Sequence, residues 1–292
     1  MIRLRHSLPL ALYCLLVGLS AVPSPAQAQE ASLDLRQIER DLEGKYGIQL
    51  KNGSRQIGRV VAWDGKTLRL EVELGGGSAE MQFAADEIRD VAFPGEEYLM
   101  RLNRLVDDPE RTKDALALFR ALYKQRGPYI EYLDANELNF FDRYARYAMN
   151  NGEPLMAVSI INVLRPHIED EARIRSLEDA LLLSFFLAGM REEAETQARE
   201  WIEAADPAGS SALGWRILAE IHFQEERYET ALWTALYPVT FSTQMPMEHL
   251  DTCYAFAVAA AGLDRQPEVQ VRLYREMLDR GLSWPAKIPA LD

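Results

Sequence analysis

The spacing of apolar positions divides this 292-residue chain into segments of different character. An apolar run covers residues 8–22, and residues 35–42 place their apolar positions at helical spacing. Residues 48–93 then alternate between apolar and polar positions, whereas helical spacing returns from residue 96 onward. The pattern therefore predicts an apolar leader, a short helix, a small β domain and a long helical region.

The β pattern lies within residues 29–95, together with the short helix. From Leu68 to Leu74 apolar residues alternate with charged ones, so one face of the predicted strand is apolar. The dipeptides Asn52-Gly53 and Asp64-Gly65 and the glycines at 75–77 favour tight turns between neighbouring strands. Five short strands make too little sheet for a sandwich, and closure would remove the exposed edges. We therefore predict a small five-stranded barrel.

The helical region shows an internal period. Ala157, Ala194 and Ala231 lie 37 residues apart, each within a similar helical pattern. A constant step of this size is typical of stacked helical hairpins, because one such unit cannot bury its apolar face alone. We predict about five hairpins over residues 96–283, followed by an extended tail at residues 284–292.

The clearest repeat carries a recognisable set of packing residues. Trp215, Leu218 and Ala219 lie in its first predicted helix, and Tyr228 and Ala231 lie in its second. This pattern resembles a tetratricopeptide repeat, in which small residues let antiparallel helices approach and large residues fill the gap. In layout, the β segment resembles an SH3-like or Sm-like barrel. The expected fold class is α+β multidomain, a small barrel followed by an all-α solenoid.

Some positions depart from the repeat pattern. Leu182 stands where a small residue is expected, and Pro238 is expected to end the second helix of its unit early. The step from Ala115 to Ala157 is 42 residues instead of 37. We therefore expect degenerate repeats.

The first 28 residues have the layout of a secretory signal. Arg3 and Arg5 precede the apolar run, and Ala26-Gln27-Ala28 forms a small-x-small cleavage site. A membrane anchor is the alternative, but the run is too short to span a bilayer and no basic cluster follows it. We therefore expect an exported, periplasmic protein without a membrane anchor after cleavage.

Charge and cysteine content restrict the classes of partner. The chain has 32 Lys and Arg against 45 Asp and Glu, a net charge of −13. Loss of residues 1–28 removes two arginines, which leaves 30 basic and 45 acidic residues and a net charge of −15. This balance argues against nucleic acid or anionic lipid as the main partner. Cys253 is then the only cysteine, and its apolar neighbours predict a buried side chain.

No catalytic or metal-binding pattern stands out. The histidines His167, His222 and His249 are not spaced to share one helix face, so we expect no metal and no cofactor. His222 falls where the repeat packs an aromatic residue and is expected inside. The chain has no Gly-x-Ser-x-Gly motif, and its paired carboxylates fall at predicted helix ends. We therefore predict a protein that is not an enzyme.

The resemblance implies that the first helices of successive hairpins line a groove. The corresponding positions combine both signs of charge with Phe and Met, which suits a peptide or helix as partner. For any single position, an ordinary contact between helices is the alternative. The predicted groove residues are Asn139, Asp142, Arg146, Met149, Asn150, Asp179, Phe186, Arg216, Glu220, Phe223 and Gln224.

Together these features predict a non-catalytic adaptor or scaffold that binds protein or peptide segments of an envelope assembly. A second hypothesis is a peptidoglycan- or glycan-binding protein that acts through the barrel, with Trp63 and Phe83 as the available aromatic residues. A third is a hydrolase, which would need a deep pocket with carboxylates of unlike pKa.

Overall fold

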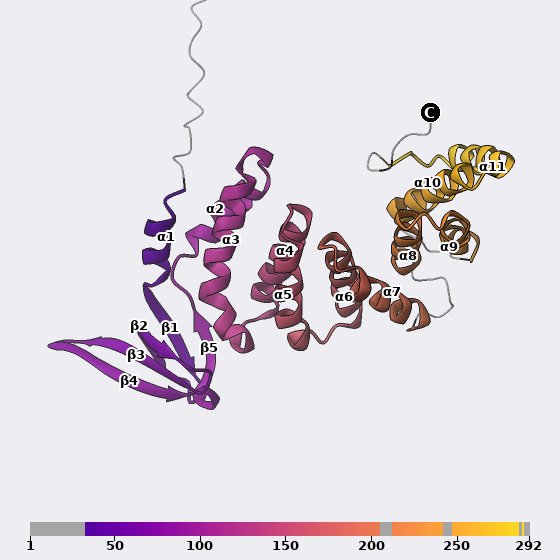
Figure 1. Cartoon of the computed structure of the whole chain (residues 1–292). Coiled ribbons are helices and arrows are strands. Elements are labelled where there is room, and N and C mark those ends of the chain that lie inside the picture. The colour runs from indigo at the N-terminus through magenta and orange to yellow at the C-terminus, as the bar shows by residue number, and fades with distance from the viewer. Residues whose placement is uncertain (1–32, 205–211, 242–246, 286–287, 289–292) are drawn as a thin grey trace, which may run out of the picture. The chain divides into compact units, whose positions relative to one another are not determined.

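The computed structural model describes residues 33–204, 212–241, 247–285 and 288. The predicted leader at residues 1–28 lies outside these ranges. From Leu35 onward the described residues belong to one compact unit. It begins with a short helix and an antiparallel sheet and continues as paired helices, so the predicted α+β layout of a β segment followed by a helical region is confirmed (Figure 1).

A short helix and a sheet form the first part of this unit. The elements are α1 (Leu35–Leu42), β1 (Lys45–Leu50), β2 (Arg55–Trp63), β3 (Thr67–Leu74), β4 (Gly77–Ala84) and β5 (Ile88–Ala92). The strands lie in the order β4-β3-β2-β1-β5, and every neighbouring pair is antiparallel. Alternation decides which face is inside: Ile48, Leu68 and Leu70 are fully buried, whereas Arg69 and Glu71 are exposed.

The predicted closure into a barrel is wrong. In the described part of the chain, β4 and β5 form the two ends of the strand order and do not pair with each other. The apolar face is covered instead by the 3₁₀ helix η3 (Gly127–Tyr132), which follows the first helical pair. Tyr129 is buried in the core of the sheet, and Tyr132 and Leu133 pack against that core. Because these residues bury the apolar face, the sheet needs no closure to keep it from water.

Hydrogen bonds join the sheet segment to the first helical pair. The buried side chain of Gln125 donates through Nε2 to the backbone oxygens of Leu42 and Pro94, at 3.0 Å each. The indole Nε1 of Trp63 donates to the carbonyl oxygen of Pro128 at 2.9 Å. These bonds satisfy backbone groups on both sides of the predicted boundary at residue 95.

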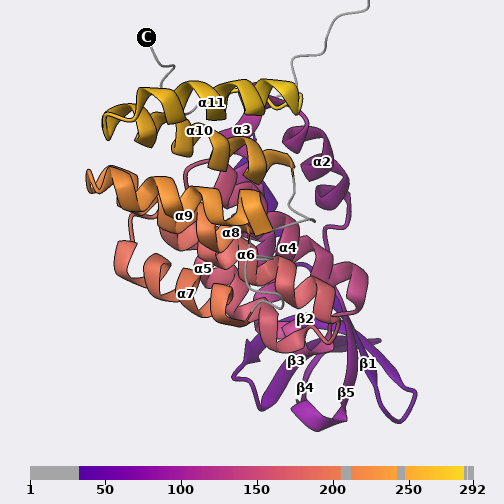
Figure 2. The ribbon, with the colours of Figure 1, turned by 90° about the vertical axis from the view of Figure 1, so that its right-hand side faces the viewer.

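The rest of the unit consists of helices that pair in chain order. The pairs are α2 (Glu97–Val106) with α3 (Thr112–Arg126), α4 (Ala135–Asn150) with α5 (Pro154–Leu164), α6 (Glu171–Leu187) with α7 (Arg191–Ala204), α8 (Ala212–Gln224) with α9 (Tyr228–Phe241), and α10 (Met247–Leu263) with α11 (Pro267–Asp279). The first helices also contact one another in sequence, α4 with α6, α6 with α8 and α8 with α10. Figure 2 gives a second view of these pairs.

Small residues make the close approach of paired helices possible. Ala157, Ala194 and Ala231, which lie 37 residues apart, are all fully buried. A larger side chain at these positions would push the facing helix away. The sequence period therefore corresponds to a repeated packing contact.

The turns within the last four helical pairs, from α4–α5 to α10–α11, repeat the same backbone motif. In each turn, a hydrogen bond from a backbone N–H just past the turn to the carbonyl oxygen five residues earlier closes the first helix. The donors are Glu153, Met190, Arg227 and Gln266, and the bonds are 2.8 to 3.0 Å long. The residue before each of these has a positive φ, as the Schellman ending of a helix requires.

The prediction that Pro238 ends its helix early is wrong. Helix α9 continues through Pro238 to Phe241. Proline lacks the N–H that would bond within the helix, at a cost of about 3 kcal/mol. However, α9 is packed between α8 and α10, and Leu236 and Val239 beside the proline contact the apolar core. We infer that this packing outweighs the lost hydrogen bond.

Candidate partner-binding groove

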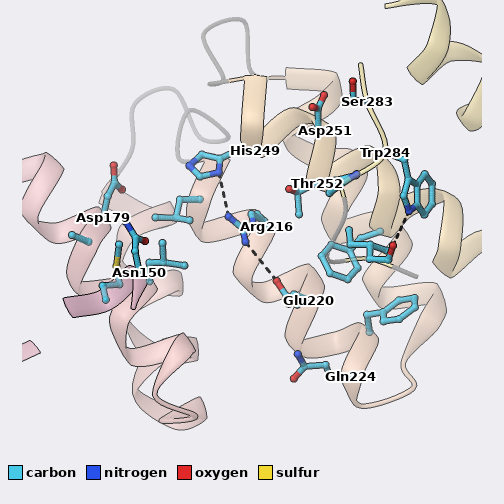
Figure 3. A pocket seen from close by; sticks show the side chains of 18 of the residues that line it. Asn150, Asp179, Arg216, Glu220, Gln224, His249, Asp251, Thr252, Ser283 and Trp284 are labelled. Carbon is cyan, nitrogen blue, oxygen red and sulfur yellow. Dashed lines mark hydrogen bonds and ion pairs between the residues drawn. The ribbon is translucent and has the colours of Figure 1, made fainter. Parts of the chain in front are cut away.

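A cavity of about 940 Å³ lies along the row of first helices (Figure 3). Its walls come from α4, α6, α8 and α10, and from the chain that follows α11. We call this cavity the groove. Its lining combines aromatic and aliphatic side chains with a few charged ones, a composition typical of sites that bind peptide segments.

Most of the groove residues predicted from the repeat pattern line this cavity. They come from three successive first helices, which the helical period places on the same side of the array. The predicted residues in the lining are Arg146, Met149, Asn150, Asp179, Arg216, Glu220, Phe223 and Gln224. That they bind a partner stays a prediction.

The other three predicted residues lie elsewhere. Asn139 is exposed on α4, outside the lining. Asp142 accepts a hydrogen bond from Nε of Arg146 at 2.9 Å and so acts on the groove through that side chain. Phe186 packs against the apolar cluster formed by α6, α7 and α8, where it fills an ordinary contact between helices.

The guanidinium of Arg146 bridges two helices of the groove wall. Its Nε contacts Asp142 on the same helix, and its second terminal nitrogen donates to Oγ of Ser176 on α6 at 2.8 Å. The backbone oxygen of Ser176 accepts a further bond at 3.3 Å. Most of the donor capacity of this guanidinium is therefore used within the wall.

Arg216 is held more loosely. Its terminal nitrogens lie 3.9 Å from a carboxylate oxygen of Glu220 and 3.5 Å from Nδ1 of His249. Dashed lines mark both contacts in Figure 3. Its buried Nε has no hydrogen-bond partner among the described atoms. Because charge-assisted hydrogen bonds are strongest near 2.8 Å, these long contacts leave Arg216 able to bind a further acceptor.

Asp179 supplies a partly buried carboxylate on α6. Burial raises its pKa above the ordinary value of an aspartate, and a hydrogen bond from the indole Nε1 of Trp201 at 3.0 Å opposes this shift. The positive charge of Arg146 opposes it as well. The groove therefore holds a carboxylate that is desolvated and already bonded on one side.

Sequence reasoning missed the part of the groove that α10 contributes. His249, Thr252 and Phe256 line the cavity at helical spacing, so they share one helix face. Carrying the groove positions into this last pair, as the packing positions were, could have found them. Ser283, Trp284, Pro285 and Ile288 also line the cavity, and no repeat pattern points to them.

A second cavity of about 380 Å³ lies where β5, α2 and α4 meet. Its buried Arg126 pairs with Glu137 at 3.1 Å and stands over the ring of Phe93, 4.6 Å from the centroid. Burial lowers the pKa of Arg126 and raises that of Glu137. None of the predicted groove residues lines this cavity.

The remaining residues whose side chains could act in catalysis or metal binding lie outside the groove lining. His222 is buried, as predicted, and its Nδ1 lies 2.7 Å from the guanidinium of Arg227. Burial, with Arg227 contributing, lowers the pKa of this histidine. Cys253 is a free, fully buried cysteine, also as predicted, and burial raises its pKa to about 12.

Within the described ranges, no group of His, Cys, Asp and Glu is arranged to hold a metal ion. Nor does any helix in these ranges combine the length and apolar character needed to cross a membrane. Searches against known protein families, curated proteins and solved structures found no match for this chain.

Proposed function

We propose that this chain is a non-catalytic adaptor that holds a segment of a partner protein in the groove. The observation that carries the proposal is the convergence of the repeat pattern with the cavity. Positions chosen from the repeat register alone, such as Met149, Asp179 and Gln224, line one continuous hollow. Residues brought together in this way by separate repeats provide a collective surface of the kind that helical arrays use for binding.

The paired helices support a tetratricopeptide-like arrangement in particular. Ala219 and Ala231 are both fully buried, as close packing of α8 on α9 requires. Trp215 stacks on Tyr237 of α9, with ring centroids 4.2 Å apart, and so fills space between helices of one pair. The order of the strands is compatible with an SH3-like layout for the β segment, without closure.

The proposed partner is a protein or peptide segment of an assembly in the cell envelope. This part of the proposal rests on the sequence pattern of residues 1–28, which is typical of an exported protein. The net negative charge of the chain favours a protein partner over a nucleic acid. The side chains of the groove carry both signs of charge, so an extended or helical segment of mixed polarity fits best.

The glycan-binding hypothesis has less support. Trp63 stacks on Tyr129 at 5.7 Å between ring centroids and bonds to the backbone of Pro128. Phe83 is only 7% exposed and belongs to the core of the sheet. Both aromatic residues available for sugar stacking are thus engaged in internal packing. For the third hypothesis, a hydrolase, the groove offers three partly buried carboxylates, Asp179, Glu220 and Asp251, of which Asp179 already accepts a hydrogen bond from Trp201.

Site-specific photo-crosslinking in the producing cell tests the adaptor proposal. A photoreactive amino acid replaces Asn150 or Gln224, which are exposed in the groove, and separately Leu155 or Trp233, which are exposed on second helices. We expect a discrete protein adduct from the groove positions and none from the control positions. Equal adducts at both sets of positions, or none in the groove, would contradict the proposal.

A further inference from the structure

Part of the groove is already occupied by the chain itself. After α11, the chain turns at Gly281, and Leu282 is buried in the same apolar core as α10. The residues that follow, Ser283, Trp284 and Pro285, line the groove together with Ile288 (Figure 3). We call these four residues the C-terminal segment.

Internal hydrogen bonds fold the C-terminal segment into a turn. The N–H of Ile288 donates to the carbonyl oxygen of Pro285 at 3.0 Å, and Nε1 of Trp284 donates to the carbonyl oxygen of Ile288 at 2.8 Å. Of the tail predicted to be extended at residues 284–292, the structure describes only positions 284, 285 and 288. The turn brings an aromatic and an aliphatic side chain, four positions apart, onto the apolar core of the last two pairs.

Apolar contacts account for the attachment of the segment to the groove. Ile288 is 7% exposed, and the indole of Trp284 meets the ring of Tyr274 on α11 edge to face, 6.2 Å between centroids. Both hydrogen bonds described above stay inside the segment. Contacts of this kind stabilise without fixing a single partner, because another segment with the same apolar side chains can replace them.

We propose that the C-terminal segment is an internal ligand of the groove, which a partner segment displaces. It occupies the end of the groove formed by α10. The partner would carry an aromatic residue and an aliphatic residue four positions later, in a turn or a helix, because this is the arrangement that the groove already holds. The competition rests on the proposed function, whereas the docking of the segment does not.

The covalent link makes this competition effective. A tethered ligand acts at an effective concentration in the millimolar range, so it excludes a free ligand of similar intrinsic affinity. The apparent affinity of the free ligand is its intrinsic affinity multiplied by the fraction of time that the site is open. Weakening the internal segment should therefore raise the affinity of the groove for a free segment of the same kind.

A peptide with the sequence of residues 281–292, carrying a fluorophore, tests the docking of the segment. Fluorescence anisotropy measures its binding to the full chain and to the full-length double variant Trp284→Ala/Ile288→Ala. We expect binding to the double variant about tenfold tighter or more than to the wild type. A peptide in which Trp284 and Ile288 are replaced by alanine should not bind. Equal affinity of the first peptide for both proteins, or no binding to either, would overturn the proposal.

Two further variants test whether the tighter peptide binding comes from loss of the C-terminal segment or from a general loss of structure. Trp284→Phe keeps the ring but loses the hydrogen bond to Ile288, so its affinity for the peptide should lie between those of the wild type and the double variant. Leu278→Ala removes an exposed apolar side chain from α11, outside the groove, and should bind the peptide as weakly as the wild type does. Tight binding by Leu278→Ala would show general loosening of the last pair and would contradict the inference.

Crosslinking separates this inference from the adaptor proposal. With the photoreactive residue at position 224, the double variant should give several times more partner adduct than the wild type. Unchanged adduct yield would overturn the competition and leave the adaptor proposal standing. Peptide binding as expected, with no groove adduct in any variant, would remove the adaptor proposal and leave the docking of the C-terminal segment standing.

Discussion

Glu226 has the same left-handed backbone conformation as Gly189, which lies 37 residues earlier in the chain. Their φ angles are +60° and +73°, and each residue ends the first helix of a pair. Bonds from Arg227 N–H to the oxygen of His222, and from Met190 N–H to that of Phe185, close the two turns at 3.0 Å. One turn thus recurs with glycine in one repeat and glutamate in the next.

Replacing Glu226 by glycine should stabilise the protein. A residue with a Cβ in the left-handed region costs about 1–2 kcal/mol, and the greater freedom of glycine in the unfolded chain offsets part of this gain. The side chain of Glu226 is exposed. We expect the free energy of unfolding in urea to rise by about 0.5–1 kcal/mol, with the slope unchanged.

The reverse change at Gly189 provides the control. A Cβ added at Gly189 would meet no heavy atom within 4 Å, so Gly189→Ala reports the backbone cost alone. It should destabilise by about 1 kcal/mol. Stabilisation by this change would refute the backbone explanation at both positions.

Removing the amide of Gln125 should weaken the junction between sheet and helices. Gln125→Ala removes the donor to the carbonyl oxygen of Pro94 and one of two donors to that of Leu42, which keeps the hydroxyl of Tyr46 at 3.3 Å. We expect a loss of about 2–3 kcal/mol in unfolding free energy. The matched change Gln82→Ala, on the exposed surface of β4, should stay within about 0.5 kcal/mol. Similar losses for both variants would contradict this account.

The raised pKa of Asp179 predicts a pH-dependent effect of Asp179→Asn. In the wild type the folded state holds a proton more tightly than the unfolded state, because burial disfavours the carboxylate. The stability that the protonated carboxyl of Asp179 contributes is therefore lost as the pH rises through the pKa that this group has in the folded state. The asparagine variant should melt about 1–2 °C higher at pH 7, with its oxygen still accepting from Trp201.

This advantage should shrink as the pH is lowered through the pKa of Asp179, since the wild-type carboxyl becomes neutral. Melting curves of both proteins between pH 7 and pH 3 measure it. Glu203→Gln, on the exposed part of α7, is the control and should show no such convergence.

Cys253, the single cysteine once residues 1–28 are removed, should be unreactive in the folded state. Cys253 is fully buried and its pKa is about 12, so at pH 8 nearly all of it is the neutral thiol. A thiol-specific reagent should label it only above the urea midpoint. A second cysteine introduced at the exposed Thr230 should react at once. Rapid labelling of Cys253 without urea would show that α10 opens locally.

The parts of the fold that follow from local burial could be predicted from the sequence. The alternation from Leu68 to Leu74 located a strand, and the recurrence of Ala157, Ala194 and Ala231 located paired helices, because each pattern is imposed by immediate neighbours. That the sheet stays open could not be predicted in this way. Tyr129, which covers the apolar face, lies 37 residues beyond the last strand and carries no pattern that points to the sheet.

The same distinction holds for the groove. Arg146, Arg216 and Gln224 could be placed because the repeat register carries them to one side of the helices. His249 was missed because the groove positions, unlike the packing positions, were not carried into the last pair. Trp284 falls in the tail that follows the repeats and was not placed in the groove, since its position there depends on a turn that no repeat specifies.

The cover that η3 places over the sheet has a consequence for how the chain can be divided. Cut off after residue 95, the strands would lose Tyr129 and expose Tyr46 and Phe93, whose rings that tyrosine contacts. The helices in turn would lose the structure that terminates their stack at the N-terminal end. Sheet and first helical pair therefore form one folding unit, and truncation for expression or mutagenesis should keep residues 35–133 together.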